Sequence, residues 1–220
     1  MDKTVKEQIE YLSGFALEER WEQLKRVLSL RTHYLTVCLE NIYQSQNASA
    51  VMRTCDAFGI QDVHVIENCN EFTIHKDIAL GTDKWLDLNK HTDLNVIEKL
   101  RSKGYRIVAT TPRNNSISLL DFDLTKGKTA LFFGTELTGL SEEMMNSADE
   151  FLYIPMYGFV ESFNISVSVS IILQHLVTNL RQSDINWKLT EDEHDNILLR
   201  WLKQTVKSSD LLLKRFFEEL

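Results

Sequence analysis

Short apolar segments alternate with helical segments between residues 35 and 154, and this alternation constrains the fold more than any other feature of the chain. The apolar segments are rich in β-branched and aromatic residues, which is typical of buried strands. They are residues 35–39, 62–67, 105–110, 129–133 and 151–154. Strands that alternate with helices predict an α/β fold with a largely parallel sheet. Such sheets bind ligands outside the carboxyl ends of their strands.

Helices are predicted where apolar side chains recur at spacings of three and four. The helical segments are 5–30, 48–58, 94–103, a short helix between the last two strands, and 190–218 as one or two helices. Gly59 and Gly104 are C-terminal signals of two of these helices. The segment 164–180 begins with an alternating Ser-Val-Ser-Val-Ser pattern that suits a strand. Its long apolar continuation favours a buried helix, capped by Ser162 or Asn164.

The composition, 43% hydrophobic and 25% charged, is that of a globular protein. No apolar run is long enough to cross a bilayer and no secretory signal is evident, so we expect no membrane partner. Cys38, Cys55 and Cys69 show no metal-ligand spacing. The first two lie in apolar patterns and are predicted to be buried free thiols, which favours a reducing cytoplasm and no metal.

The net charge of −8 argues against a generic nucleic-acid coat protein, but it leaves room for a local basic face. The most basic local stretch lies in and just after segment 5–30. Its members are Arg20, Lys25, Arg26 and Arg31. A solvated helix face and an RNA-phosphate surface are both open interpretations of this stretch.

Polar loops follow the predicted strands. Asn47 suits a helix N-cap, and the simplest interpretation of Arg53 is an ion pair with Asp56 three residues on. Glu136 follows Gly134 in the loop after strand 129–133, where it is either a structural or a functional carboxylate. The sequence contains no GxSxG elbow, no GxGxxG and no Walker A pattern, so the usual hydrolase and nucleotide-binding interpretations fail.

Three segments resemble a known family. "NASAVMRTCDAFGI", "FFGTELTGLSEE" and "IPMYGFVESFNISVSVS" occur in this order and resemble the three motifs of the SpoU branch of the SPOUT RNA 2′-O-ribose methyltransferases. "RTHYLTVCLENIY" and "ALGTDKWL" resemble the TrmH-type tRNA (guanosine-2′-O)-methyltransferases within that branch.

The resemblance implies a parallel-sheet SPOUT fold with a C-terminal trefoil knot. The implied organisation is an N-terminal helical extension (1–32), a methyltransferase domain (33–182) and a C-terminal helical extension (183–220). It also implies S-adenosylmethionine as the cofactor and a homodimer whose active site forms at the subunit interface. tRNA is the implied partner, and the guanosine-18 position of its D-loop is the implied target.

Site residues are carried over position by position. The implied catalytic residues are Asn47 and Arg53 in the first motif, Glu136 in the second, and Ser162 and Asn164 in the third. The implied cofactor contacts are Thr110, Gly134, Ile154, Met156 and Phe163. The expected RNA contacts are Arg20, Lys25, Arg26, Arg31 and Lys84.

The family's usual proposal makes Arg53 the base. Because arginine stays protonated in proteins, we expect Arg53 instead to bind the phosphate beside the target ribose and to stabilise the developing alkoxide. Gly134 is expected to let the backbone approach the cofactor, and Glu136 to orient a neighbouring Asn or Arg.

Two alternatives remain. The segment 43–46 lacks the His-Lys-Pro-His-type pattern that is frequent in TrmH proteins, and residues 191–195 are acidic, so ribosomal RNA is an alternative substrate. A catalytically silent RNA-binding module is the other alternative. The matched polar positions, all intact, favour the enzyme.

Overall fold

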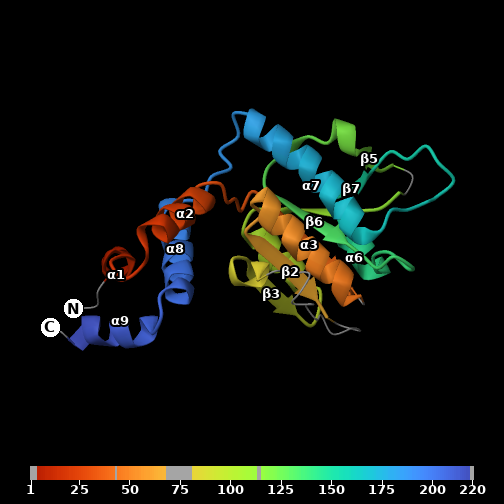
Figure 1. Ribbon diagram of the computed structural model, residues 1–220. Helices are drawn as coiled ribbons and strands as arrows, with labels where there is room; N and C mark the ends of the chain where they lie inside the picture. The colour runs from red at the N-terminus through yellow and green to blue at the C-terminus, as the bar shows by residue number, and fades with distance from the viewer. Residues whose placement is uncertain (1–3, 43, 68–80, 113–114, 219–220) are drawn as a thin grey trace. The chain divides into compact units, whose positions relative to one another are not determined.

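The computed structural model describes residues 4–42, 44–67, 81–112 and 115–218, which form two compact units (Figure 1). The first unit combines the chain up to Arg31 with the chain from Lys188 onward, and the second spans Thr32–Trp187. The sequence suggested two separate terminal extensions, whereas helices from both ends pack into one unit. The domain boundaries 1–32, 33–182 and 183–220 stay a prediction.

The first unit is helical. Its helices are α1 (Val5–Ser13), α2 (Glu18–Leu28), α8 (Glu191–Thr205) and α9 (Ser209–Glu218). α8 packs against both α1 and α2. The segment 5–30 is helical as predicted but forms two helices, because Gly14 ends α1 and Leu17 adopts an extended conformation before α2 begins.

The second unit is built on a seven-stranded sheet with the order β3-β2-β1-β6-β4-β7-β5. Its strands are β1 (Leu35–Glu40), β2 (Asp62–Ile66), β3 (Asp87–His91), β4 (Arg106–Thr110), β5 (Ile117–Ser118), β6 (Thr129–Phe133) and β7 (Glu150–Tyr153). Every neighbouring pair runs parallel, which confirms the predicted fold class. The sequence did not reveal β3 and β5, which form the two edges. The trefoil knot stays a prediction.

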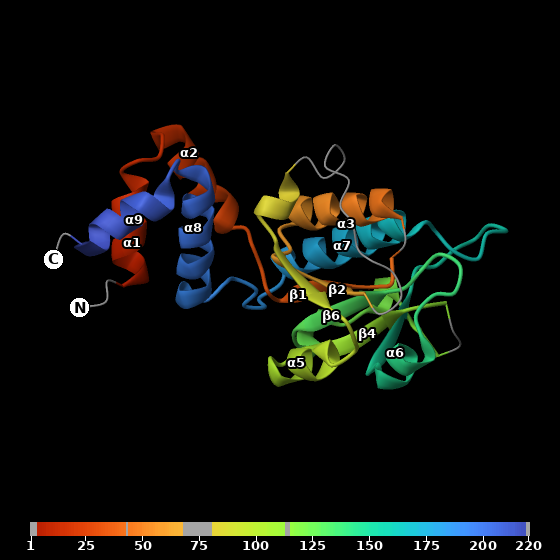
Figure 2. The ribbon, with the colours of Figure 1, turned by 90° about the horizontal axis from the view of Figure 1, so that it is seen from below.

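Helices cover both faces of the sheet (Figure 2). α3 (Ser45–Phe58) and α7 (Ile165–Gln182) lie side by side on one face, and α5 (Val96–Ser102) and α6 (Glu142–Ser147) lie on the other. Alternate residues of β1 therefore enter two different apolar cores, Leu39 on the α3 side and Cys38 on the α5 side. The Ser-Val-Ser-Val-Ser segment is helical, as predicted. Ser170 within it lies 3.2 Å from Thr54 of α3, measured between hydroxyl oxygens.

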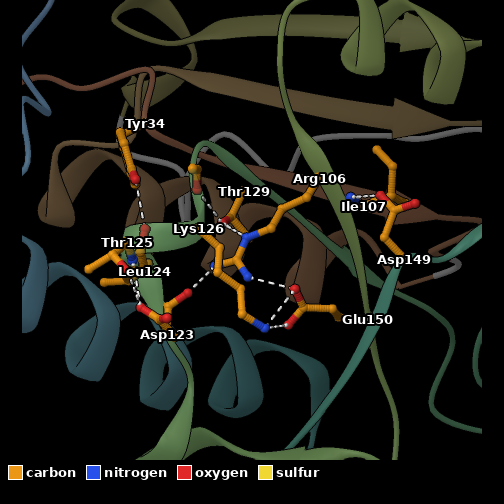
Figure 3. A network of polar contacts seen from close by, with 11 residues as sticks. Tyr34, Arg106, Ile107, Asp123, Leu124, Thr125, Lys126, Thr129, Asp149 and Glu150 are labelled. Carbon is orange, nitrogen blue, oxygen red and sulfur yellow. Dashed lines mark hydrogen bonds and ion pairs between the residues drawn. The ribbon is translucent and has the colours of Figure 1, made fainter.

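A polar network joins the amino ends of β4 and β7 to the chain before β6 (Figure 3). Arg106 donates from Nη1 to Glu150 at 2.8 Å, from Nε to Thr129 at 3.1 Å, and from Nη2 to the carbonyl of Asp123. Tyr34 donates to the carbonyl of Leu124 at 2.7 Å. The network therefore lies at the amino ends of these strands, opposite to their carboxyl ends.

Cys38 and Cys55 are buried free thiols, as predicted, while Cys69 lies outside the described residues. Within the described part of the chain, no helix has both the length and the apolar character needed to cross a membrane.

Candidate active site

The loops after the carboxyl ends of β4, β6 and β7 line one cavity of about 420 Å³. A cavity of this size suits a small-molecule ligand. The residues predicted to contact the cofactor all line it, and they are Thr110, Gly134, Ile154, Met156 and Phe163. Glu136 and Ser162 line it as well. The rule that parallel sheets bind ligands at the carboxyl ends of their strands therefore located the cavity correctly.

The loop 134–140 after β6 forms much of the cavity wall and is closed on itself. Thr135 and Gly139 exchange backbone hydrogen bonds of 3.1 and 3.0 Å. A Cβ atom at Gly134 would overlap the backbone of Gly139 and Leu140. Gly134 is thus required first by the packing of its own loop. The expectation that Gly134 lets the backbone approach the cofactor therefore has a structural reason beside it, and a larger residue at this position would also disturb the loop.

One predicted polar residue from each of the three motifs, Asn47, Glu136 and Asn164, takes part in one chain of hydrogen bonds. Nδ2 of Asn47 donates to Glu136, and Oδ1 of Asn47 accepts from Nδ2 of Asn164 at 3.1 Å. Oδ1 of Asn164 in turn accepts from the backbone N–H of Ser166 at 2.9 Å. Glu136 therefore orients an asparagine, as predicted, and Asn47 links it to Asn164.

The helix-cap predictions had different outcomes. Asn164 is the N-cap of α7, as predicted. The prediction that Asn47 caps α3 is wrong, because α3 already begins at Ser45 after the N-cap position Gln44. Asn47 lies buried in the first turn, where its Nδ2 also donates to Oε1 of Gln44 at 2.9 Å.

Arg53 lies away from this cavity. It is exposed on α3, about 9 Å along the helix axis from Asn47, and borders a second cavity of about 340 Å³ that Thr54 and Ser170 also line. Within the described residues, no ion pair joins Arg53 to Asp56, so the simplest interpretation of Arg53 is wrong. Within a single chain, Arg53 does not line the cavity formed by the loops after β4, β6 and β7.

The basic residues proposed to contact RNA differ in their surroundings. On α2, Arg20 donates to Gln23 at 2.6 Å and Lys25 pairs with Glu22 at 2.5 Å, while Arg26 is exposed. Lys84 is exposed in the short helix η1 (Thr82–Lys84) of the second unit.

The prediction that Arg31 contacts RNA is wrong, because Arg31 is buried. Its side chain is 2% exposed, and its guanidinium lies 5.3 Å from the centre of the Trp201 ring. A side chain buried against an aromatic ring contributes to the packing of the helical unit and does not form a phosphate-binding surface.

Sequence reasoning missed several residues of the site. Gln44, which accepts from Asn47, precedes α3, and Leu137 and Glu161 line the cavity from its loops. Their only signal in the sequence was that they lie in a loop at the end of a strand.

At the opposite ends of the strands, possible metal-ligand atoms of His33, Asp62 and Asp87 lie within 4.8 Å of one another. His33 and Asp62 approach to 3.6 Å, which suits an ion pair when the histidine is protonated. The absence of a metal stays a prediction.

Comparisons with known proteins agree with this geometry. Residues 34–174 match the SpoU rRNA Methylase family. The chain is 46% identical to the tRNA (guanosine(18)-2′-O)-methyltransferase of Borreliella burgdorferi, covering 94% of this chain and 95% of the relative. The crystal structure of the A. aeolicus TrmH/SpoU tRNA modifying enzyme superposes with a TM-score of 0.77 at 32% identity, covering 87% of this chain and 98% of that one.

A more distant structure shares the fold. It is the SpoU methyltransferase AviRb from Streptomyces viridochromogenes in complex with the cofactor AdoMet, with a TM-score of 0.62 at 23% identity, covering 73% of this chain and 65% of that one. The family match spans most of the chain, and the relative from B. burgdorferi covers almost all of it. The chain belongs to the SpoU methylase family.

Proposed function

We propose that this chain transfers a methyl group from S-adenosylmethionine to a ribose 2′-hydroxyl of RNA, with guanosine 18 of tRNA as its target. The observation that carries the proposal is the hydrogen-bond chain Glu136–Asn47–Asn164 beside the loop cavity. The activity named for the relative with 46% identity supports the tRNA assignment.

The residues of the cavity fit the cofactor. Ile154, Met156 and Phe163 offer half-buried apolar surface for an adenine ring, and the loop 134–140 offers backbone groups beside them. S-adenosylmethionine, when bound, supplies an electrophilic methyl group on a sulfonium. The chain's own contribution is to hold the two reactants in line, which turns a bimolecular reaction into an effectively unimolecular one.

Arg53 has a separate task in this proposal. Its planar guanidinium binds the phosphate next to the target ribose and stabilises the developing alkoxide. Because Arg53 lies apart from the cavity of its own chain, a second copy supplies it, and the active site forms between two chains. Tyr157, Phe159 and Val160 expose apolar surface in the loop after β7, which favours such a contact between copies.

The remaining parts of the proposal concern the substrate and the setting. Arg20, Lys25 and Arg26 on α2, and Lys84, are candidates for phosphate contacts. The buried thiols of Cys38 and Cys55 suit a reducing cytoplasm. The chain around the loop cavity is proposed to form the family's trefoil knot.

Three transcripts test the substrate. Purified protein and labelled S-adenosylmethionine are incubated with a tRNA transcript, with the same transcript carrying a 2′-O-methyl group at guanosine 18, and with ribosomal RNA. Label in the first transcript alone supports the proposal. Label in ribosomal RNA alone supports the activity in the family's description, and no label in any RNA supports a silent RNA-binding module.

Complementation tests the shared site. Arg53→Ala and Glu136→Gln chains, each inactive alone, are unfolded together and refolded. If each site takes Arg53 from one copy and Glu136 from the other, half of the dimers are mixed and each carries one intact site, so about a quarter of the wild-type activity returns. No recovery contradicts the shared site.

A further inference from the structure

A buried carboxylate at the carboxyl end of β1 contacts the end of the loop that lines the cavity. Glu40 is 2% exposed. Its Oε2 accepts from the backbone N–H of Ser141 at 2.8 Å, and its Oε1 accepts from the Ser141 hydroxyl at 2.6 Å. Carboxylates are rarely buried because an unpaired buried charge is costly, and charge-assisted bonds such as these offset that cost.

Ser141 stands at the junction between the loop and α6. As the N-cap of α6 it accepts from the backbone N–H of Met144 at 3.2 Å. The loop 134–140 before Ser141 is closed on itself by the hydrogen bonds between Thr135 and Gly139. The position of this loop relative to the sheet is therefore set by the two points at which the loop is attached. Gly134 attaches one end directly to β6, and Glu40 holds the other end through Ser141.

The chain that follows β1 also holds the middle of the loop. Asn47, in the first turn of α3, donates to Glu136. Glu40 and Asn47 come from the same strand–helix connection, and they contact the loop at its exit and at its centre. A shift of Ser141 would therefore move Glu136 relative to Asn47.

We infer that Glu40 is a positioning residue for the active site. Through Ser141 it holds the loop 134–140 in the shape that binds the cofactor and presents Glu136 to Asn47. The identity of the cofactor rests on the proposed function, whereas the hold on the loop rests on the hydrogen bonds alone. Glu40 does not line the cavity, so its effect passes through the loop.

Glu40→Ala and Glu40→Gln test this inference on the full chain. Calorimetry measures S-adenosylmethionine binding, and hydrogen exchange measures the amides of residues 135–140 without cofactor. Glu40→Ala is expected to weaken binding about tenfold, because a loosened loop must be ordered on binding. Its loop amides exchange faster. Glu40→Gln keeps an oxygen for the N–H of Ser141 and an amide that can donate to the hydroxyl, so it binds within about threefold of wild type.

Glu67→Ala is the matched control. Glu67 follows β2, is partly buried and pairs with Lys90 at 3.0 Å, and among the described residues no hydrogen bond or ion pair joins it to the loop 134–140. This variant is expected to bind the cofactor as the wild type does. If Glu40→Ala lowers the free energy of unfolding but leaves both cofactor affinity and loop exchange unchanged, Glu40 is only structural and the inference is wrong.

Ser141→Ala covers the case in which Glu40→Ala does not fold. It removes the hydroxyl and keeps the backbone N–H, so faster loop exchange and a smaller loss of affinity are expected. Ser118→Ala, which removes another helix cap outside the cavity, is its control. Unchanged exchange in a folded Ser141→Ala chain overturns the inference. If the wild-type chain binds no S-adenosylmethionine, the proposed function fails, and loop exchange alone decides the role of Glu40.

Discussion

Asn164 donates from Nδ2 to Oδ1 of Asn47 at 3.1 Å, although the two residues are 117 positions apart in the chain. Nδ2 of Asn47 faces the opposite way, toward Gln44 and Glu136. Both ends of the Asn47 amide are therefore engaged, which fixes its orientation. The loops after β1, β6 and β7 are joined at this one side chain.

Asn47→Asp is expected to break this connection. It replaces the Nδ2 donor with a carboxylate oxygen beside Glu136, and two like charges repel each other. We expect methyl transfer to fall about 100-fold, the scale reported for losing a preorganised contact, with a smaller loss of cofactor affinity. Single-turnover assays and calorimetry measure the two effects. Asn146→Asp, on the exposed side of α6, is the control. Wild-type transfer in Asn47→Asp would remove Asn47 from the catalytic set.

Arg53→Ala tests whether this residue acts on RNA. Because Arg53 does not line the loop cavity, S-adenosylmethionine affinity should stay at the wild-type value. Methyl transfer should fall about 10²–10³-fold, equivalent to about 2.7–4 kcal/mol. Arg53→Lys should recover little, because a point charge does not reproduce the bidentate fork.

Asp56→Ala is the control for Arg53, since it removes the side chain that the simplest interpretation paired with Arg53. Transfer at the wild-type rate in Asp56→Ala, together with a loss in Arg53→Ala, supports a direct contact with RNA. Near-wild-type transfer by Arg53→Ala at saturating tRNA would contradict the proposed role.

The centre of the sheet was predictable because its strands are buried on both faces. β1 and β6 are buried along their whole length, so their sequences are mainly apolar, with Thr36, Glu40 and Thr129 as the polar members. β3 is an edge strand, half-buried and polar, and its sequence Asp-Leu-Asn-Lys-His carries no strand pattern. β5 pairs over only two residues, too few for any periodicity.

The location of the site could be predicted from the sequence, but the tertiary contacts that hold its loops in place could not. Polar loops at strand ends indicated the cavity, and the family resemblance supplied the proposed roles of Asn47 and Glu136. Local sequence could not show that Arg31 is buried against Trp201, from the other end of the chain. A charged residue ending an apolar strand was a signal for Glu40, but its partner Ser141 is set by tertiary packing.

The contact between buried His64 and half-buried His91 is expected to make stability depend on pH. Nδ1 of His64 and Nε2 of His91 lie 3.0 Å apart, and His64 is 6% exposed. Burial lowers the pKa of His64 to about 3, and the positive charges of His91 and Lys103 add to the effect. The folded chain therefore keeps His64 neutral at pH values where the unfolded chain protonates it.

The stabilising contribution of neutral His64 is present above the unfolded pKa of about 6.5 and is lost as pH falls toward 3. Between pH 7 and 5 we expect the free energy of unfolding to drop by about 2 kcal/mol from this group. Urea denaturation at both pH values measures the drop. His64→Val, which matches the neighbouring valines of β2, should reduce it by about that amount. An unchanged drop would assign the acid sensitivity to other groups.

The ion pair between Arg106 and Glu150 offers a test of how burial sets the value of a salt bridge. The ion pair, drawn in Figure 3, joins side chains that are 11% and 18% exposed, and the guanidinium also lies 4.5 Å from the centre of the Phe122 ring. Arg101 provides a matched contrast within the same unit. Unlike Arg106, it has two acidic partners, Glu98 and Asp149, and its side chain is 37% exposed.

Arg106→Ala is expected to lower the free energy of unfolding by about 3 kcal/mol, because it leaves Glu150 and the carbonyl of Asp123 without their shared donor in a mostly buried network. Arg101→Ala should lower the free energy of unfolding by less than about 1 kcal/mol, because solvent screens the ion pairs of this exposed side chain and can hydrate Glu98 and Asp149 when the arginine is removed. Urea denaturation with equal slopes for the two variants compares them directly. Equal losses would mean that burial does not set the value of these ion pairs. A loss below about 1 kcal/mol in Arg106→Ala would show that the network only accompanies the packing of β4 and β7.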